Sequence, residues 1–185
     1  MKFTTRKLTV MAMLVAISVV LVYLVHFPIF PAMDFLEYDP ADIPILIGTF
    51  AFGPVAGIVL TVIASGIQAL TVSAQSGPYG FIMHVIATGT LVLVSGIIYR
   101  IRHSRAGAVL ALLCGTVAMG LVMMVANHFI TPAFGMPVDV VDALLLPVIL
   151  PFNLIKAGIN SLITFLLYKS VSRYVIKGEP MRKKK

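Results

Sequence analysis

The sequence predicts an all-α integral membrane protein, folded as one compact bundle of six transmembrane helices. Hydrophobic residues make up 59% of the 185 residues and charged residues only 11%, and the mean hydropathy is +1.04. An ordinary soluble domain is about a quarter charged. The charges also flank long apolar stretches, and one bilayer crossing needs roughly 20 apolar residues. We therefore expect a single membrane domain covering residues 1–185.

The charge pattern predicts how this bundle is oriented. Basic residues precede the first apolar stretch, occupy the 100–105 loop and dominate a tail at 169–185, whereas six of the seven acidic residues lie at 34–42 and 139–142. Cytoplasmic loops are enriched in Lys and Arg, so both termini are expected in the cytoplasm, which requires an even number of crossings. Despite a pI near 9.8, no basic patch with interleaved aromatics favours nucleic-acid binding.

The first expected span covers residues 8–25 and ends before Pro28, because proline bars continuation of a helix. The connector at 28–42 combines aromatic and acidic residues. This amphipathic mixture suits a cap over a pocket, although an ordinary solvated connector would have a similar composition.

The second and third spans are short and adjacent, at residues 43–52 and 54–72. Asp42 is a suitable N-cap for the second span, and the Gly53-Pro54 pair separates the two helices. Gly53 and Gly57 are four residues apart, a spacing that permits close backbone approach.

The remaining spans are expected at residues 81–99, 106–130 and 143–168. A Gly- and Pro-containing turn at 76–80 precedes the first of these. The basic 100–105 loop then leads into the next span, and an irregular loop with Gly and Pro precedes the last. The total of six crossings satisfies the even number that the charges require.

One cation, Lys156, lies well inside the last span. A charge at the centre of a membrane helix costs about 2.5 to 3.5 kcal/mol on insertion scales and usually marks a functional site. Lys169 is 13 residues away, roughly 20 Å along a helix, too far for Lys156 to reach the cytoplasmic surface. Asn153 and Asn160 share its helix face. We expect a ligand-contacting stripe, with a structural polar cluster as the alternative.

Other polar residues in the spans carry weaker signals. Asn127, near the external end of span 106–130, is expected either to join this site or to cap its helix, and His84 is interpreted as a packed histidine. No Asp or Glu was assigned to the interior of a span, so a proton relay is not expected. The sequence has no phosphate-binding G-x-x-x-x-G-K-[ST] loop. No catalytic or metal-ligating residue is predicted.

Three segments carry a resemblance to a known family. They are residues 35–44 (FLEYDPADIP), 48–57 (GTFAFGPVAG) and 151–158 (PFNLIKAG). Over essentially the whole chain, the sequence resembles the riboflavin-specific substrate-binding components of energy-coupling factor (ECF) vitamin transporters, the RibU type. The resemblance implies a non-enzymatic six-helix subunit in a prokaryotic plasma membrane, which captures riboflavin from outside as transported ligand and uses no cofactor.

The resemblance also implies site residues. Asn153 and Lys156 would contact the vitamin, joined by Asn127, and the connector would close as a lid. The connector residues of this expected site are Leu36, Glu37, Tyr38 and Asp39. Phe35, Tyr38 and Tyr79 are candidates for stacking on the flavin ring, and Asn160 completes the polar stripe.

The expected partners are a transmembrane scaffold (T) subunit and two cytoplasmic ATPases. Ala12 and Ala16 place two small residues on one face of the first span, where the scaffold would dock, although internal packing uses the same spacing. The alternatives in function are an S component for thiamine or biotin, an assembly subunit, or a small intramembrane enzyme with Lys156 as base.

Overall fold

The structure is a computed structural model that describes residues 4–30 and 36–171. Its helices are α1 (Thr5–Leu24), α2 (Asp42–Phe52), α3 (Pro54–Leu70), α4 (Gly77–Ile101), α5 (Arg105–Ile130), α6 (Val138–Leu144) and α7 (Leu150–Val171). Its shorter elements are the 3-10 turns η1 (Ala74–Ser76) and η2 (Thr131–Phe134), the π-helical segment η3 (Leu145–Ile149), and the strands β1 (Phe27–Pro28) and β2 (Glu37–Tyr38). Most of the expected basic tail lies outside the described residues.

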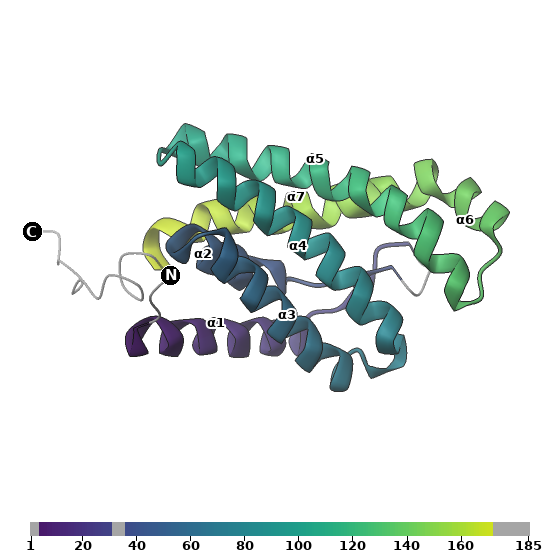
Figure 1. Ribbon diagram of the computed structural model, residues 1–185, viewed down its shortest axis with the longest axis horizontal. Coiled ribbons are helices and arrows are strands. Elements are labelled where there is room, and N and C mark those ends of the chain that lie inside the picture. Colours follow the sequence, from purple (N-terminus) through teal and green to yellow (C-terminus); the bar gives the residue numbers. More distant parts are fainter. Residues whose placement is uncertain (1–3, 31–35, 172–185) are drawn as a thin grey trace, which may run out of the picture.

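The predicted mainly helical bundle is confirmed (Figure 1). Because η3 joins α6 and α7 into one helical run, the described residues form six helices. Within residues 4–30 and 36–171, four helical runs are long and apolar enough to cross a membrane: Thr5–Leu24, Ala74–Ile101, Arg105–Phe134 and Val138–Tyr168. The other two, α2 and α3, have 11 and 17 residues. At 1.5 Å per residue these are about 16 and 25 Å long, less than the roughly 30 Å hydrocarbon core.

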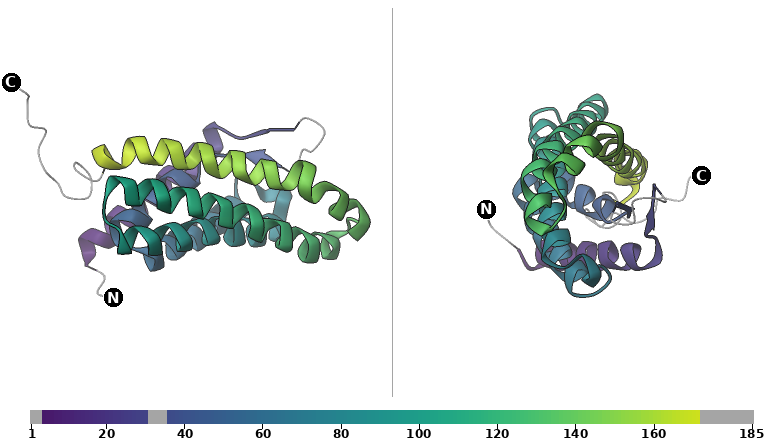
Figure 2. Two further views of the ribbon diagram at one scale, coloured as in Figure 1. Left: turned by 90° about the horizontal axis from the view of Figure 1, so that it is seen from above. Right: turned by 90° about the vertical axis from the view of Figure 1, so that its right-hand side faces the viewer.

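The helix termini and the turns between helices lie at the two ends of the bundle. The start of α1, the α4–α5 turn and the end of α7 lie at one end, and the α5–α6 connection lies at the other (Figures 1 and 2). Ser104 begins α5 by accepting a hydrogen bond from the Gly107 amide at 3.0 Å. Leu46, Leu60 and Leu91, from three different helices, are fully buried between them. The basic turn is thus at the end opposite α6.

Just before α2, residues 36–41 lie inside the bundle rather than on its surface. Strands β1 and β2 pair antiparallel, with Phe27 opposite Tyr38, and Tyr38, Ala41 and Asp42 are all buried. The Ser18 hydroxyl on α1 donates to the Ala41 carbonyl at 2.9 Å. Non-helical backbone at membrane depth is tolerated where protein surrounds it. The short strand pair was not predicted from the sequence.

The start of α2 also differs in detail from the sequence expectation. Ala41 occupies the N-cap position, and Asp42 is the first helical residue, with its side chain fully buried. Because α2 is only about half as long as the hydrocarbon core is thick, it spans only about half the depth of the bundle. The entering segment and a cavity occupy the remainder.

Glycine and proline shape the joints between helices. Gly53 has φ +93° and turns the chain from α2 into α3. A Cβ on Gly57 would overlap the Thr49 side chain, whereas a Cβ on Gly53 would meet no atom within 4 Å, so the tight contact is made at Gly57 alone. Pro147 lies within η3, where it has no amide hydrogen to donate and clashes with a regular α-helical turn. The last helical run begins at Val138, five residues before the predicted start.

Candidate ligand-binding site

A cavity of about 650 Å³ lies among α3, α4, α5, α7 and the β2 segment. Its apolar lining consists of Leu36, Ala69, Val72, Phe81, Met83, Ala87, Met119, Met123, Phe134, Met136 and Phe152. Its polar lining consists of His26, Glu37, Asp39, Ser65, Gln68, Ser73, Gln75, Ser76, Tyr79, His84, Asn127, Thr131, Asn153 and Lys156. Small-molecule sites have volumes in this range and combine apolar side chains with polar groups that orient the ligand.

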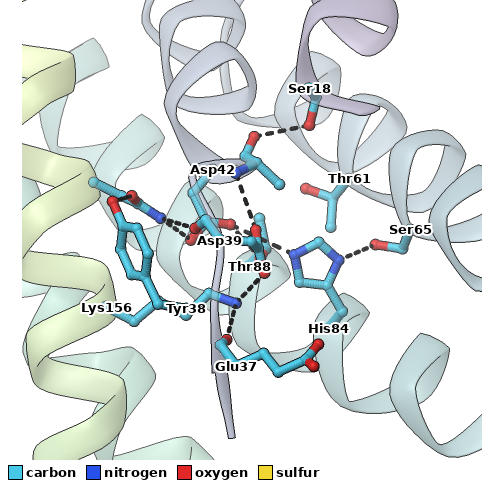
Figure 3. Close-up of polar contacts among 12 residues, drawn as sticks. Ser18, Glu37, Tyr38, Asp39, Asp42, Thr61, Ser65, His84, Thr88 and Lys156 are labelled. Atoms are coloured by element: carbon cyan, nitrogen blue, oxygen red, sulfur yellow. Dashed lines mark hydrogen bonds and ion pairs between the residues drawn. The ribbon is translucent and has the colours of Figure 1, made fainter. Parts of the chain in front are cut away.

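Lys156 is held in a buried ion pair. Only 7% of the residue is exposed, and its Nζ donates to Oδ2 of Asp39 at 2.6 Å and to the Glu37 carbonyl at 3.5 Å (Figure 3). Lys156 therefore has a carboxylate partner, although the sequence predicts no Asp or Glu inside a span, because Asp39 reaches it from the connector before α2. An ammonium has three donor hydrogens, so one remains for a ligand.

A second carboxylate, Asp42, is also inside the bundle, although none was assigned there from the sequence. Its exposed fraction is 0%. It accepts hydrogen bonds from the Thr88 hydroxyl at 2.6 Å and from Asn160 Nδ2 at 3.0 Å, and His84 Nε2 lies 3.7 Å away. A buried carboxylate is tolerated when it is paired and hydrogen-bonded in this way.

Tyr38 and Asn160, both predicted to contact the ligand, lie behind the cavity wall. The Tyr38 hydroxyl donates to Asn160 Oδ1 at 3.0 Å, and Asn160 Nδ2 donates to the Asp39 carbonyl at 3.0 Å. The Tyr38 ring packs against Phe27 with centroids 5.3 Å apart. Together these residues brace the entering segment against α7.

The environment of Tyr38 suppresses its ionisation. Burial, followed by the nearby carboxylates of Asp39 and Asp42, raises the pKa of the Tyr38 hydroxyl above its ordinary value of 10.0, against a smaller opposing effect of the Lys156 cation. The hydroxyl is therefore a hydrogen-bond donor to Asn160 at neutral pH.

The two asparagines predicted for the site do line the cavity. Asn153 Nδ2 donates to the Ile149 carbonyl at 2.8 Å, which fixes the side chain within its own helix. Asn127 Nδ2 donates in the same way to the Met123 carbonyl at 2.7 Å, and its Oδ1 accepts from the Thr131 hydroxyl at 3.0 Å. Neither amide can rotate without losing a hydrogen bond.

The predicted aromatic residues are divided between two places. Tyr79 lines the cavity, and its ring lies 5.1 Å from that of Phe134. Tyr38 packs away from the cavity, and Phe35 lies outside the described residues. Phe81 and Phe152 line the cavity but were not predicted.

Sequence reasoning also missed the methionine and polar lining of the far walls. Met119 and Met123 precede Asn127 at intervals of four, so all three share one face of α5, and this spacing was a usable signal. His84, interpreted as a packed histidine, lines the cavity and has its Nδ1 2.9 Å from the Ser65 hydroxyl. Gln68 follows Ser65 by one turn on α3 and also lines the cavity.

Ala12 and Ala16 are exposed on α1, remote from the cavity lining. Met13, Ile17 and Val20 are exposed beside them, so this face is not used for packing within the described chain. Among residues 4–30 and 36–171, no group of three or more His, Cys, Asp or Glu side chains is placed to hold a metal ion.

Residues 6–168 match the family model of the ECF transporter substrate-specific component. The chain belongs to this family. This S component is 29% identical over 177 residues to "Riboflavin transporter RibU" of Staphylococcus aureus (strain TCH60), with 92% of each chain covered. It is 29% identical over 180 residues to "Riboflavin transporter FmnP" of Bacillus subtilis (strain 168), covering 92% of this chain and 94% of the relative.

A solved structure agrees with this membership. The S component superposes on the S component of a bacterial ECF transporter with a TM-score of 0.78 and 32% sequence identity, over 91% of this chain and 96% of the other. The family resemblance inferred from the three sequence segments is therefore confirmed. Its members are transporter components, so an intramembrane enzyme is no longer a competing explanation for Lys156.

Proposed function

We propose that this S component captures riboflavin for an ECF transporter. The observation that carries the proposal is the cavity in which Lys156 and Asn153 share a polar wall while aromatic and methionine side chains form the others. The two relatives named as riboflavin transporters, each matched over more than nine tenths of its length, support the same ligand.

The polar wall suits the carbonyl- and imide-bearing edge of a flavin ring. Lys156 only donates hydrogen bonds, which fits a ring carbonyl, whereas the Oδ1 of Asn153 is an acceptor that fits a ring N–H. The Nδ2 bond of Asn153 to Ile149 orients Oδ1 for this purpose. The flat ring would lie between apolar side chains such as Phe152 and Met123.

The entering segment acts as the lid in this proposal. Leu36, Glu37 and Asp39 line the cavity and come from the segment between α1 and α2. Asp39 is bonded to Lys156, so the lid and the polar wall are mechanically linked. Movement of the segment would alter the position of the Lys156 ammonium.

The cavity faces the exterior in the orientation that the charges favour. The basic α4–α5 turn lies at the end opposite α6 (Figure 2), and loops rich in Arg and Lys stay in the cytoplasm. The expected T subunit would dock on the Ala12 and Ala16 face of α1, and two cytoplasmic ATPases would supply the energy. The location would be a prokaryotic plasma membrane, with both termini inside.

A riboflavin titration of the purified S component tests the proposal. Binding is read from quenching of flavin fluorescence and from a rise in the melting temperature in detergent. Thiamine and biotin are added as competitors, because another vitamin on the same fold is the remaining alternative. If saturating riboflavin neither binds nor stabilises the protein, or if thiamine or biotin binds instead, the assignment is wrong.

A further inference from the structure

We propose that a recess at the basic end of the bundle binds the headgroup of an anionic phospholipid. The recess has a volume of about 560 Å³ and shares no lining residue with the ligand cavity. Its lining comes from the end of α2, the start of α3 and the stretch of chain from Gly96 to His103. The inference goes beyond the proposed function and does not depend on riboflavin.

The recess exists because the joint between α2 and α3 stops short of the end of α4. Gly96 on α4 packs so closely against this joint that a Cβ there would lie 2.8 Å from Cγ2 of Thr49 and 2.9 Å from Cβ of Pro54. Helix α4 continues from Gly96 to Ile101, about 7.5 Å farther along its axis. The joint is therefore the floor of the recess, and the last turn of α4 rises beside it, at the end of the bundle where α1 begins (Figure 1).

Three stacked rings form one wall of the recess. The ring centroids of Phe50 and Tyr99 are 4.3 Å apart, and those of Tyr99 and His103 are 4.5 Å apart. The Nδ1 of His103 donates a hydrogen bond to the Tyr99 carbonyl at 2.8 Å. Its Nε2 is therefore left to accept from a headgroup hydroxyl, or to donate to a phosphate oxygen when the ring is protonated.

The charge of the recess is positive. Arg100 and His103 line it, and none of the described Asp or Glu residues does. Arg100 is exposed and forms no ion pair with any carboxylate in residues 4–30 and 36–171. The Nζ of Lys7 on α1 lies 5.2 Å from the ring centroid of Phe52, another lining residue. The planar guanidinium of an arginine matches two oxygens of a phosphate at once.

Apolar side chains continue from the recess along the outside of the bundle, and they favour a lipid over a free phosphate ion. Leu93, Ile97 and Ile101 are spaced by four on α4, and all three are exposed. Arg100 follows Ile97 by three, so it lies on the same side of the helix. Val55 on α3 is also exposed and lines the recess. A phospholipid with its phosphate against Arg100 would lay its acyl chains along these residues.

The position of the recess suits the same ligand. The charge pattern predicts that the basic end of the bundle lies in the cytoplasm. Basic pockets between transmembrane helices on that side of a membrane are typical sites for anionic headgroups. Tyrosine is also enriched at the level of the headgroups, where its ring is apolar and its hydroxyl is hydrated.

The test measures lipid binding to the full-length S component in a neutral detergent. The probes are dioctanoyl phosphatidylglycerol, dioctanoyl phosphatidylcholine, which has the same chains but no net charge, and glycerol 3-phosphate, which has the phosphate but no chains. Binding is read from discrete adducts in native mass spectrometry and from the melting temperature. Arg100→Gln removes the guanidinium. Arg105→Gln is the matched control, because Arg105 carries the same charge at the start of α5 but does not line the recess.

We expect phosphatidylglycerol to bind more tightly than either other probe. Arg100→Gln should weaken it about tenfold, the usual effect of losing a hydrogen bond to a charged group, whereas Arg105→Gln should change it by less than about twofold, because exposed charges away from the site are screened. Arg100→Lys keeps the charge but not the planar fork, and an intermediate loss is expected. Should Arg100→Gln fail to fold, Arg100→Lys and His103→Gln replace it, and both should weaken phosphatidylglycerol more than Arg105→Gln does.

Four results would overturn the inference. Equal losses in Arg100→Gln and Arg105→Gln would mean that the basic turn attracts anions without a site. Equal binding of the two lipids would leave only an apolar groove, and glycerol 3-phosphate binding as tightly as phosphatidylglycerol would make this a site for a free phosphate. Loss of co-purification with the T subunit in Arg100→Gln, with lipid binding unchanged, would make the recess a protein-docking surface.

Discussion

The Nζ of Lys156 and the Oδ2 of Asp39 lie 2.6 Å apart, although 117 residues separate them in the sequence. The contact joins the first third of α7 to the segment that enters the bundle before α2. A buried ion pair contributes little net stability, but removal of one partner leaves a charge that is costly to keep out of water. The connection is therefore best probed by removing each partner and then both.

Replacement of Asp39 alone should be strongly destabilising. We expect Asp39→Asn to lower the free energy of unfolding of the ligand-free protein by about 3 kcal/mol, because the Lys156 ammonium loses the carboxylate with which it forms a buried ion pair. The double variant Asp39→Leu with Lys156→Met should recover most of that loss. Denaturation in detergent measures both. Glu37→Gln is the control, since the structure uses only the Glu37 backbone carbonyl to bind Lys156.

Lys156→Met should make the free energy of riboflavin binding less favourable by about 1.5 to 3 kcal/mol, the range expected for a hydrogen bond to a charged group. Titration by fluorescence quenching measures this change. Lys169→Met, on the same helix, is the control and should leave the affinity unaltered. An unchanged affinity in a folded Lys156→Met variant would show that the ammonium serves the lid alone.

Asn160 should act through position rather than through ligand contact. Asn160→Leu leaves both the Tyr38 hydroxyl and one oxygen of Asp42 without a partner, so we expect a loss of about 3 kcal/mol in stability. The affinities for riboflavin and for lumiflavin, a flavin with a methyl group in place of the hydroxylated chain, should fall by the same factor, because Asn160 does not line the cavity. Thr164→Val is the control, since that hydroxyl bonds only within its own helix. A loss selective for one ligand would contradict this role.

The raised pKa of Tyr38 predicts that the stability of the folded protein depends on pH in the alkaline range. The folded state holds the hydroxyl neutral, so its contribution to stability is complete below pH 10 and is lost as the pH rises through the folded-state pKa. The melting temperature of the ligand-free protein should therefore fall less steeply between about pH 9 and 12 in Tyr38→Phe than in wild type. Parallel curves for the two proteins would argue against this cause.

The exposed alanine face should matter for assembly only. Ala12→Trp and Ala16→Trp are expected to abolish co-purification with the T subunit while riboflavin binding to the isolated S component stays within twofold, because this face is remote from the cavity. Val117→Trp, on the exposed face of α5, is the control. Retained assembly in both α1 variants would place the docking surface elsewhere.

Periodicity, charge placement and helix breakers were sufficient to predict the six helices and the polar stripe on α7. They identify Lys156 because a lone cation in an apolar stretch is conspicuous without any knowledge of its neighbours. The same reasoning misplaced Asp39 and Asp42, since carboxylates between two spans look like an external loop. Asp39 pairs with Lys156, 117 positions away, and Asp42 pairs with residues 46 and 118 positions away, which no local pattern reveals.

The far wall of the cavity was harder to predict for a related reason. Gln68 and Ser65 are neutral residues in an apolar helix, and their spacing alone does not distinguish a ligand site from internal packing. The surroundings of His84 are visible only in the structure, where α3 places Ser65 beside it. By contrast, the four-residue interval joining Met119, Met123 and Asn127 was visible in the sequence and would have extended the predicted site to α5.

The π-helical segment η3 makes the length of the chain there as important as its composition. Each residue of an α-helix advances the side chains by about 100°, so loss of one residue from Leu145–Ile149 would turn α6 by that angle relative to α7. Asp142 would then leave His128, its partner on α5, or Asn153 and Lys156 would leave the cavity. Substitutions in this stretch are expected to be tolerated far better than insertions or deletions.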